Sequence, residues 1–132
     1  MKVNDNAGTT SHVFPSVQVD KHGSVFVAWL DRRDDPVNNL LTNTWADVSH
    51  DNGLTFGQDQ LQSDVATTWF VRRDARPNFG DYNSSELLDF EKFVTVWADG
   101  RFPAQSPLDP TLVSFQRRAT PDVIFTIANG LQ

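Results

Sequence analysis

Short apolar runs separated by turn residues fill the first half of the chain. Residues 14–19 alternate apolar and polar side chains, whereas residues 24–30 are almost continuously apolar. Alternation is typical of a strand with one buried face, and a continuous apolar run is typical of a strand buried on both faces. Two further strand-like runs follow at residues 43–49 and 55–61. The pattern therefore predicts one antiparallel meander of four strands between residues 13 and 61.

The same order of signals returns in the second half of the chain. After a charged connection over residues 62–80, strand-like runs occur at residues 81–88, 92–98, 111–117 and 123–128. No stretch keeps a helical period, because Gly, Pro and Asp recur too often. We therefore predict an all-β chain of two four-stranded antiparallel meanders, with a flexible lead-in over residues 1–12 and the second meander over residues 81–132.

The two halves are related by an internal repeat with an offset of 68 positions. The corresponding residues are Trp29 and Trp97, Asp31 and Asp99, Arg33 and Arg101, Ser16 and Ser84, and Phe14 and Tyr82. Repeated four-stranded sheets are the signature of propeller blades, although two similar hairpins in a β-sandwich would give the same pattern.

The stretch from Ser49 to Phe56 is the most specific local signal in the chain. Asp51 can accept hydrogen bonds from its own backbone, and Gly53 tolerates a positive φ, as a tight hairpin turn requires. Thr55 and Phe56 then suit the start of an outgoing strand. We interpret this stretch as a structural turn lock with Phe56 as its core anchor. Residues 119–122 are assigned to the corresponding turn of the second copy, where no glycine is present.

The spacing Ser-x-Asp-x-Gly-x-Thr-Phe resembles the Asp-box, or BNR repeat, of sialidase-like β-propellers. Residues 79–82 resemble a blade entry of bacterial sialidase-like proteins, and residues 27–33 resemble the second strand of a blade with its exit loop. The Asp-box also falls in the third turn of the meander, where this family carries it, and this favours blades over a sandwich. The resemblance is spread over residues 14–101 and implies a propeller, which usually has six blades in sialidases.

A chain of 132 residues has the length for two such blades. Two blades cannot close a ring, and each open end would expose an apolar sheet face. The chain is therefore expected to be a cyclic homo-oligomer, with three copies completing a six-bladed ring, or a fragment of a longer protein. An open two-sheet domain is the remaining possibility.

Charge and composition narrow the classes of partner. The net charge is −6 and the arginines occur as scattered pairs, so no basic face for nucleic acid is predicted. The chain has no cysteine, no apolar run near the roughly 20 residues of a membrane span, and no apolar signal-peptide core. We predict a soluble chain with no membrane span, either intracellular or already without its signal, since the family it resembles is often secreted.

Loops of a meander alternate between the two ends of the sheet. The turns at residues 20–23, 50–54, 89–91 and about 118–122 define the turn end. The connections at residues 31–42, 62–81 and 99–110 define the long-loop end, where we expect ligands to bind. The ligand-binding candidates there are Asp31, Arg33, Arg76, Asp81, Tyr82, Asp99 and Arg101.

The resemblance implies a sialidase mechanism with an arginine clamp, a tyrosine nucleophile and an aspartic acid/base. The catalytic candidates are Tyr82, Asp81 and Arg101, but the Phe-Arg-Ile-Pro element of the family is absent. The repeated Asp–Arg positions favour structural ion pairs, one in each blade. We therefore predict a non-catalytic module that recognises a carbohydrate or protein. The alternatives are an exo-α-sialidase active in a completed ring and a structural interaction domain with open sheet edges. No cofactor or metal site is predicted.

Overall fold

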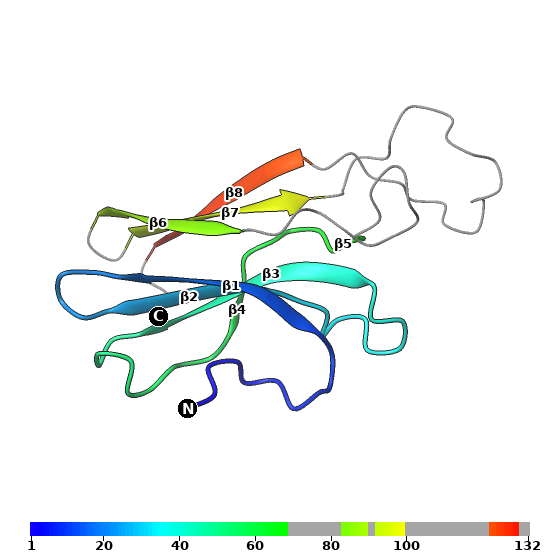
Figure 1. Cartoon of the computed structure of the whole chain (residues 1–132), viewed down its shortest axis with the longest axis horizontal. Helices are drawn as coiled ribbons and strands as arrows, with labels where there is room; N and C mark the ends of the chain where they lie inside the picture. The colour runs from blue at the N-terminus through cyan, green and yellow to red at the C-terminus, as the bar shows by residue number, and fades with distance from the viewer. Residues whose placement is uncertain (69–82, 90–91, 100–121, 130–132) are drawn as a thin grey trace.

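The computed structural model describes residues 1–68, 83–89, 92–99 and 122–129, and this part of the chain is all-β with no helix. The first sheet has the order β1 (His12–Val19), β2 (Val25–Asp31), β3 (Leu41–Ser49) and β4 (Gln60–Leu61), and β5 (Thr67–Thr68) also pairs with β3. The second sheet has the order β6 (Ser84–Asp89), β7 (Lys92–Asp99) and β8 (Asp122–Asn129). Neighbouring strands are antiparallel, and the two sheets form two layers (Figure 1).

The first sheet has two different faces because side chains alternate along its strands. Its inner face, which packs against the second sheet, consists of Phe26, Ala28, Leu30, Ala46 and Val48. Its outer face carries the alternate positions Val27, Trp29, Asp31, Trp45 and Asp47. β2 is buried over most of its length, as its continuous apolar run predicts.

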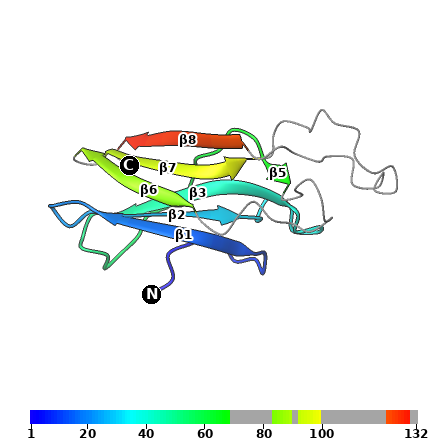
Figure 2. The ribbon, with the colours of Figure 1, turned by 45° about the horizontal axis from the view of Figure 1, so that its top comes forward.

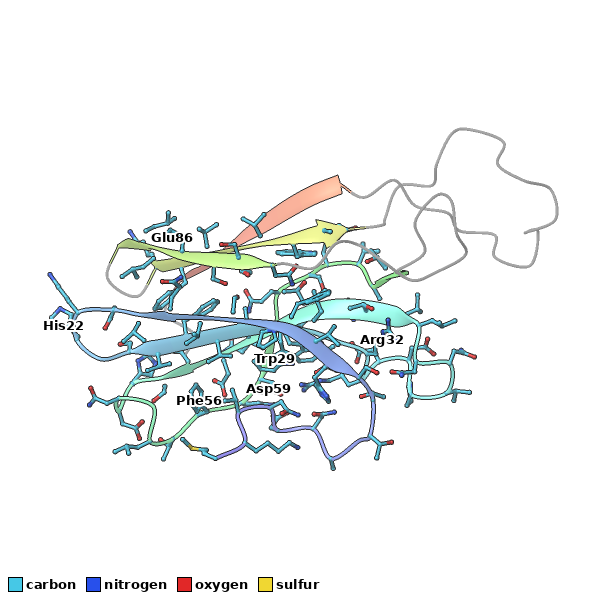
Figure 3. All side chains as sticks on the ribbon, in the orientation of Figure 1. His22, Trp29, Arg32, Phe56, Asp59 and Glu86 are labelled. Atoms are coloured by element: carbon cyan, nitrogen blue, oxygen red, sulfur yellow. The ribbon has the colours of Figure 1, made fainter. Side chains whose placement is uncertain are left out.

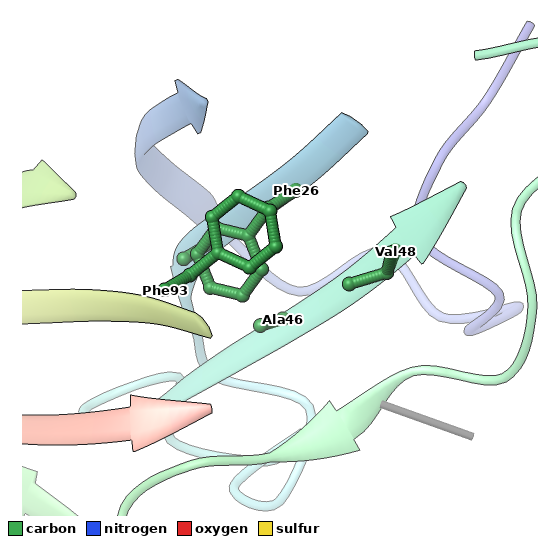
Figure 4. Close-up of a cluster of buried hydrophobic side chains, with 5 residues drawn as sticks. Phe26, Ala46, Val48 and Phe93 are labelled. Atoms are coloured by element: carbon green, nitrogen blue, oxygen red, sulfur yellow. The ribbon is translucent and has the colours of Figure 1, made fainter. Parts of the chain in front are cut away.

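The core lies between the two sheets. The rings of Phe26 and Phe93 stack with centroids 4.6 Å apart and an interplanar angle of 7° (Figure 4). Leu30 and Trp97 form a second buried cluster farther along the same strands. Since both contacts join residues in the same order, β2 and β7 run in the same direction, and Asp31 and Asp99 lie at the same end.

Polar contacts hold the edges of the two sheets together at β1 and β6. The hydroxyl groups of Ser16 and Ser85 are 2.5 Å apart, and the side-chain amide of Gln18 donates to the Ser85 carbonyl at 2.6 Å. Figure 2 shows the strands of each sheet side by side. The core therefore extends from an apolar centre to a hydrogen-bonded seam along these edge strands.

Strand register agrees with the internal repeat. Ser16 pairs with Ala28 in the first sheet, and Ser84 pairs with Val96 in the second, so each pair occupies the same place at the offset of 68. However, Trp97 faces the core, whereas its counterpart Trp29 lies on the outer face of the first sheet. The face of the second sheet that packs on the first sheet is therefore the one that corresponds to the first sheet's outer face. The two sheets are thus arranged head to tail.

The predicted fourth strand at residues 55–61 is wrong in its bounds. Only Gln60 and Leu61 pair with β3 as β4, and the pairing resumes at β5. Between them, the Ser63 hydroxyl accepts the Thr44 backbone N–H at 3.0 Å. Residues 55–59 are not in the ladder because their backbone groups bind Asp51 and Asp47 instead, as described below. The edge of the sheet is thus an interrupted strand over residues 60–68.

The predicted order of the second meander is also corrected. β8 pairs directly with β7 along its whole length, from Lys92 with Asn129 to Asp99 with Asp122. It therefore occupies the third position in the sheet rather than the fourth, and the predicted strand at residues 111–117 lies outside the described residues. Because Asp122 pairs with Asp99, it lies at the long-loop end and not at the turn end to which the sequence pattern assigns it. Residues 118–121 lie outside the described residues.

The lead-in lies across the outer face of the first sheet. Residues 1–11 contain no strand, but the Asp5 backbone N–H donates to Asp59 at 2.9 Å and the Arg32 N–H donates to the Ser11 carbonyl at 3.2 Å. The described part of the chain contains no helix long and apolar enough to cross a membrane.

Candidate functional site

The turn from Ser49 to Phe56 is closed by its own side chains. The Ser49 hydroxyl donates to Asp51 at 2.7 Å and accepts the Gly53 N–H at 2.9 Å. The Asp51 carboxylate accepts the backbone N–H groups of Leu54 and Thr55 at 2.9 and 2.8 Å, and the Thr55 hydroxyl at 2.5 Å. Gly53 has a φ of 80°. These bonds are what the turn interpretation predicts.

The turn end also agrees with the predicted alternation of loops. Gly23, in the turn after β1, has a φ of 89°, and a Cβ atom there would lie 2.0 Å from the Asn52 side-chain oxygen. The turns at residues 20–23 and 50–54 therefore pack against each other at one end of the sheet.

Hydrogen bonding lowers the pKa of Asp51 well below its ordinary value of 3.8, with the Ser49 and Thr55 hydroxyls as the leading causes. A lowered pKa means that the folded state favours the carboxylate, so its contribution to stability is present above pH 3.8 and is lost as pH falls through the lowered pKa. We expect Asp51→Ala to lower the melting temperature, and the difference from the parent protein to shrink in strong acid. Thermal melts from pH 7 to about 2 measure this difference.

Asp34→Ala is the matched control, because it removes one carboxylate from an exposed position beyond β2. Its melting temperature should change less than that of Asp51→Ala at neutral pH. An Asp51→Ala deficit that grows as the solution is acidified would contradict the assignment of Asp51 as a carboxylate-dependent turn lock.

At the long-loop end, Arg33 is held by carboxylates. Its guanidinium group lies 2.6 Å from Asp31, 2.6 Å from Asp59 and 3.1 Å from Asp5. It also lies over the Trp45 ring, 4.2 Å from the centroid. The side chains of Asp31 and Asp59 are almost fully buried, whereas Asp5 is half-exposed. The charge of Arg33 is therefore already neutralised inside the protein. Figure 3 shows its partner Asp59 on the side of the first sheet that faces away from the second sheet.

The pKa values in this cluster respond to opposing causes. Burial raises the pKa of Asp59, although Arg33 acts against it, and the hydrogen bond with Asp59 lowers the pKa of Asp5. Burial lowers the pKa of Arg33, but Asp31 and Asp59 outweigh that effect and raise it. The Arg33 guanidinium group therefore stays positively charged. Asp5 and Asp59, which are hydrogen-bonded to each other, differ in their affinity for a proton.

The repeated aspartates have a second structural partner. The Trp29 indole N–H donates to Asp31 at 3.0 Å, and the Trp97 indole N–H donates to Asp99 at 3.3 Å. Both carboxylates are fully buried. The His12 ring nitrogen also lies 3.2 Å from Asp31. The Trp-x-Asp unit thus closes the end of the second strand in each sheet.

The structure brings together only part of the predicted ligand set. Asp31 and Arg33 are in contact, and Asp99 occupies the place of Asp31 in the second sheet. The remaining candidates, Arg76, Asp81, Tyr82 and Arg101, lie outside the described residues. Neither Asp31 nor Asp99 exposes its carboxylate to solvent. The contacts that the described residues show for these two aspartates are internal ones.

A cavity at the turn end was not anticipated from the sequence. It has a volume of about 360 Å³ and is lined by Asp47, His50, Phe56, Gln58 and Gln60, among others. In the sequence, Asp47 is a charged residue within a strand-like run, on the same face as Trp45. Charged residues are seldom buried, so this position was the one sequence feature that could have indicated a site here. A second cavity of about 330 Å³ lies between the lead-in and Trp29.

Among the described residues, no group of three or more His, Cys, Asp or Glu side chains has the geometry of a metal site. Comparison with models of known protein families, with curated proteins and with solved structures yields no match.

Proposed function

We propose that the chain is a two-blade unit of a sialidase-like β-propeller that recognises a carbohydrate or protein ligand without catalysis. Each sheet would be one blade, and the ring would be completed by further copies of the chain. The ligand would bind at the long-loop end, to which Tyr82 and Arg101 are assigned from the sequence.

The head-to-tail packing of the two sheets carries the proposal. Within one chain, the inner face of the first sheet contacts the face of the second sheet that corresponds to an outer face. The second sheet's other face corresponds to an inner face, so it can make the same contact with the outer face of another copy. The face of β7 that points away from the first sheet, here called its free face, carries Val94 and Val96, which are half-buried and alternate with the core residues of β7. On the first sheet, the lead-in covers part of the outer face, at Val27 and Trp29. Val17 and Val19 lie on the same face and stay exposed, so they are the part of it that another copy would contact.

Two observations favour recognition over catalysis. Asp31 and Asp99 are both buried under a tryptophan N–H, so the repeated acids serve the two sheets alike, whereas catalytic groups are normally unique. Arg33 is paired with three carboxylates, and a substrate carboxylate would have to displace them before the clamp could form.

We expect sedimentation equilibrium to give a mass of about three times the 14.8 kDa of one chain. Val96→Lys should shift the protein to the monomer, because it places a charge on the free face of β7. Val37→Lys is the control, since Val37 is 89% exposed in a loop and should leave the assembly intact. A monomer at all concentrations would exclude the ring of copies.

Ligand assays separate the remaining alternatives. Glycan binding that is lost in Arg101→Ala and kept in Asp51→Ala would support recognition at the long-loop end. Turnover of a fluorogenic sialoside that vanishes in Tyr82→Phe would instead establish the exo-α-sialidase. Binding to no glycan would favour a structural interaction domain.

A further inference from the structure

Asp47 is a buried carboxylate with one unused oxygen. It lies in β3 with 3% of its surface exposed. Its Oδ1 atom accepts the Val48 N–H at 2.7 Å and the Gly57 N–H at 3.3 Å, whereas its Oδ2 atom has no hydrogen-bond partner. A buried charge without full compensation destabilises a fold, so such a group calls for a partner.

The cavity beside Asp47 has a consistent electrostatic character. Its lining contains two carboxylates, Asp47 and Asp51, and no lysine or arginine among the residues described there. Phe56 provides an aromatic wall, and Gln58 and Gln60 provide amides. The chain as a whole carries a net charge of −6. The cavity therefore repels anions and attracts a compact cation.

The two carboxylates are not equivalent. Asp51 is engaged by the hydroxyl and N–H groups of its own turn, so its capacity to accept further bonds is small. Burial raises the pKa of Asp47, and the hydrogen bonds from the backbone N–H groups of Val48 and Gly57 act against that effect. Asp47 is thus the carboxylate with an unused acceptor, and because its Oδ2 atom is itself buried, a ligand reaches it only when the segment at Gly57 moves aside.

We propose that this cavity is a docking site for the guanidinium or ammonium group of a basic peptide side chain, with Asp47 as its counter-ion and Phe56 as its aromatic wall. Both interactions are strong when water is excluded. Gly57, whose N–H makes only a long bond to Asp47, lets the segment over the cavity adjust without loss of side-chain packing. The site lies at the turn end and does not depend on the ring or on the ligand proposed for the long-loop end.

The test is a titration of the ¹⁵N-labelled full chain, followed by NMR, with Nα-acetyl-arginine amide and its uncharged isostere Nα-acetyl-citrulline amide. We expect saturable shifts at the amides of His50, Gly57 and Gln58 with the arginine probe, and at least tenfold weaker binding of the citrulline probe. Asp47→Asn should weaken arginine binding at least tenfold. Asp34→Asn, which removes the same charge beyond the other end of β2, should bind as the parent does.

A second variant keeps the proposal testable if Asp47→Asn is poorly folded. Gln58→Lys changes an exposed residue of the lining and supplies a competing cation, so it should abolish arginine binding while Asp47 remains. Equal binding of the two probes, unchanged binding in Asp47→Asn or Gln58→Lys, or no saturable shift with the arginine probe would each overturn the proposal.

Discussion

Replacing Phe93 with alanine is expected to lower the free energy of unfolding by about 3–5 kcal/mol. Phe93 is 1% exposed and its ring stacks on Phe26 at 4.6 Å, so the substitution leaves a cavity in the contact between the two sheets. A single domain is typically stable by about 5–15 kcal/mol, and a loss of this size is a large part of that stability. Urea denaturation of the two proteins measures the difference.

Leu88→Ala is the control for Phe93→Ala. Leu88 is an apolar residue of the neighbouring strand β6, but it is 55% exposed, and its loss should change stability by no more than about 0.5 kcal/mol. If the two substitutions cost the same, Phe93 does not join the sheets, and the stacked arrangement on which the proposed assembly rests is wrong.

Replacing Arg33 with alanine is expected to cost about 3–5 kcal/mol at neutral pH. The loss comes from Asp31 and Asp59, whose buried carboxylates would keep their charge without a counter-ion, whereas the half-exposed Asp5 contributes little. Arg33→Met should lose nearly as much, because it retains the apolar stem over Trp45 but not the charge.

The pH dependence distinguishes this charge effect from lost packing. Burial already raises the pKa of Asp59, and Arg33 acts against that effect. Without Arg33 the pKa of Asp59 should rise further above its unfolded value, so stability should increase as pH falls and this carboxyl takes up a proton. The deficit of Arg33→Ala should therefore shrink between pH 7 and about 4. Thermal melts across this range provide the measurement, and an equal deficit at both ends would contradict the charge effect.

Arg32→Ala is the control for Arg33→Ala. Arg32 is the neighbouring residue, and its guanidinium group binds a backbone carbonyl at Asn39 and the Thr42 hydroxyl. Both acceptors are neutral. The buried Asp35 also attracts Arg32, but its carboxylate is held by the backbone N–H groups of Leu40 and Leu41, so Arg32→Ala should cost only about 1 kcal/mol.

Local patterns predicted the strands and the Ser49 turn well. β1, β2, β3 and β7 lie within two residues of their predicted bounds, because alternation and apolar runs report which faces are buried. The turn was predictable because all its hydrogen bonds join residues within the stretch from Ser49 to Thr55. The strand pairing also agrees with the 68-residue offset of the internal repeat, since the pairs Ser16–Ala28 and Ser84–Val96 occupy corresponding places in the two sheets.

The errors in strand bounds and strand order arose where residues distant in sequence compete for the same backbone hydrogen-bonding groups. Residues 55–59 have a strand-like composition, but Gly57 and Asp59 bind Asp47 and Arg33 rather than the ladder. β8 pairs with β7 across an interval of 22 residues, a choice that no local signal encodes. Strand pairing of this kind depends on long-range packing, which periodicity does not report.

The fold class and the turn lock therefore follow from the chain's own order of apolar, polar and glycine residues, since these features depend on near neighbours. The role of Arg33 and the cavity at Asp47 depend on contacts between segments far apart in the chain. Arg33 meets Asp5 and Asp59 only after the lead-in and residues 57–59 fold across the outer face. The same folding buries Asp47, and burial turns an ordinary strand aspartate into the candidate counter-ion of a cationic ligand.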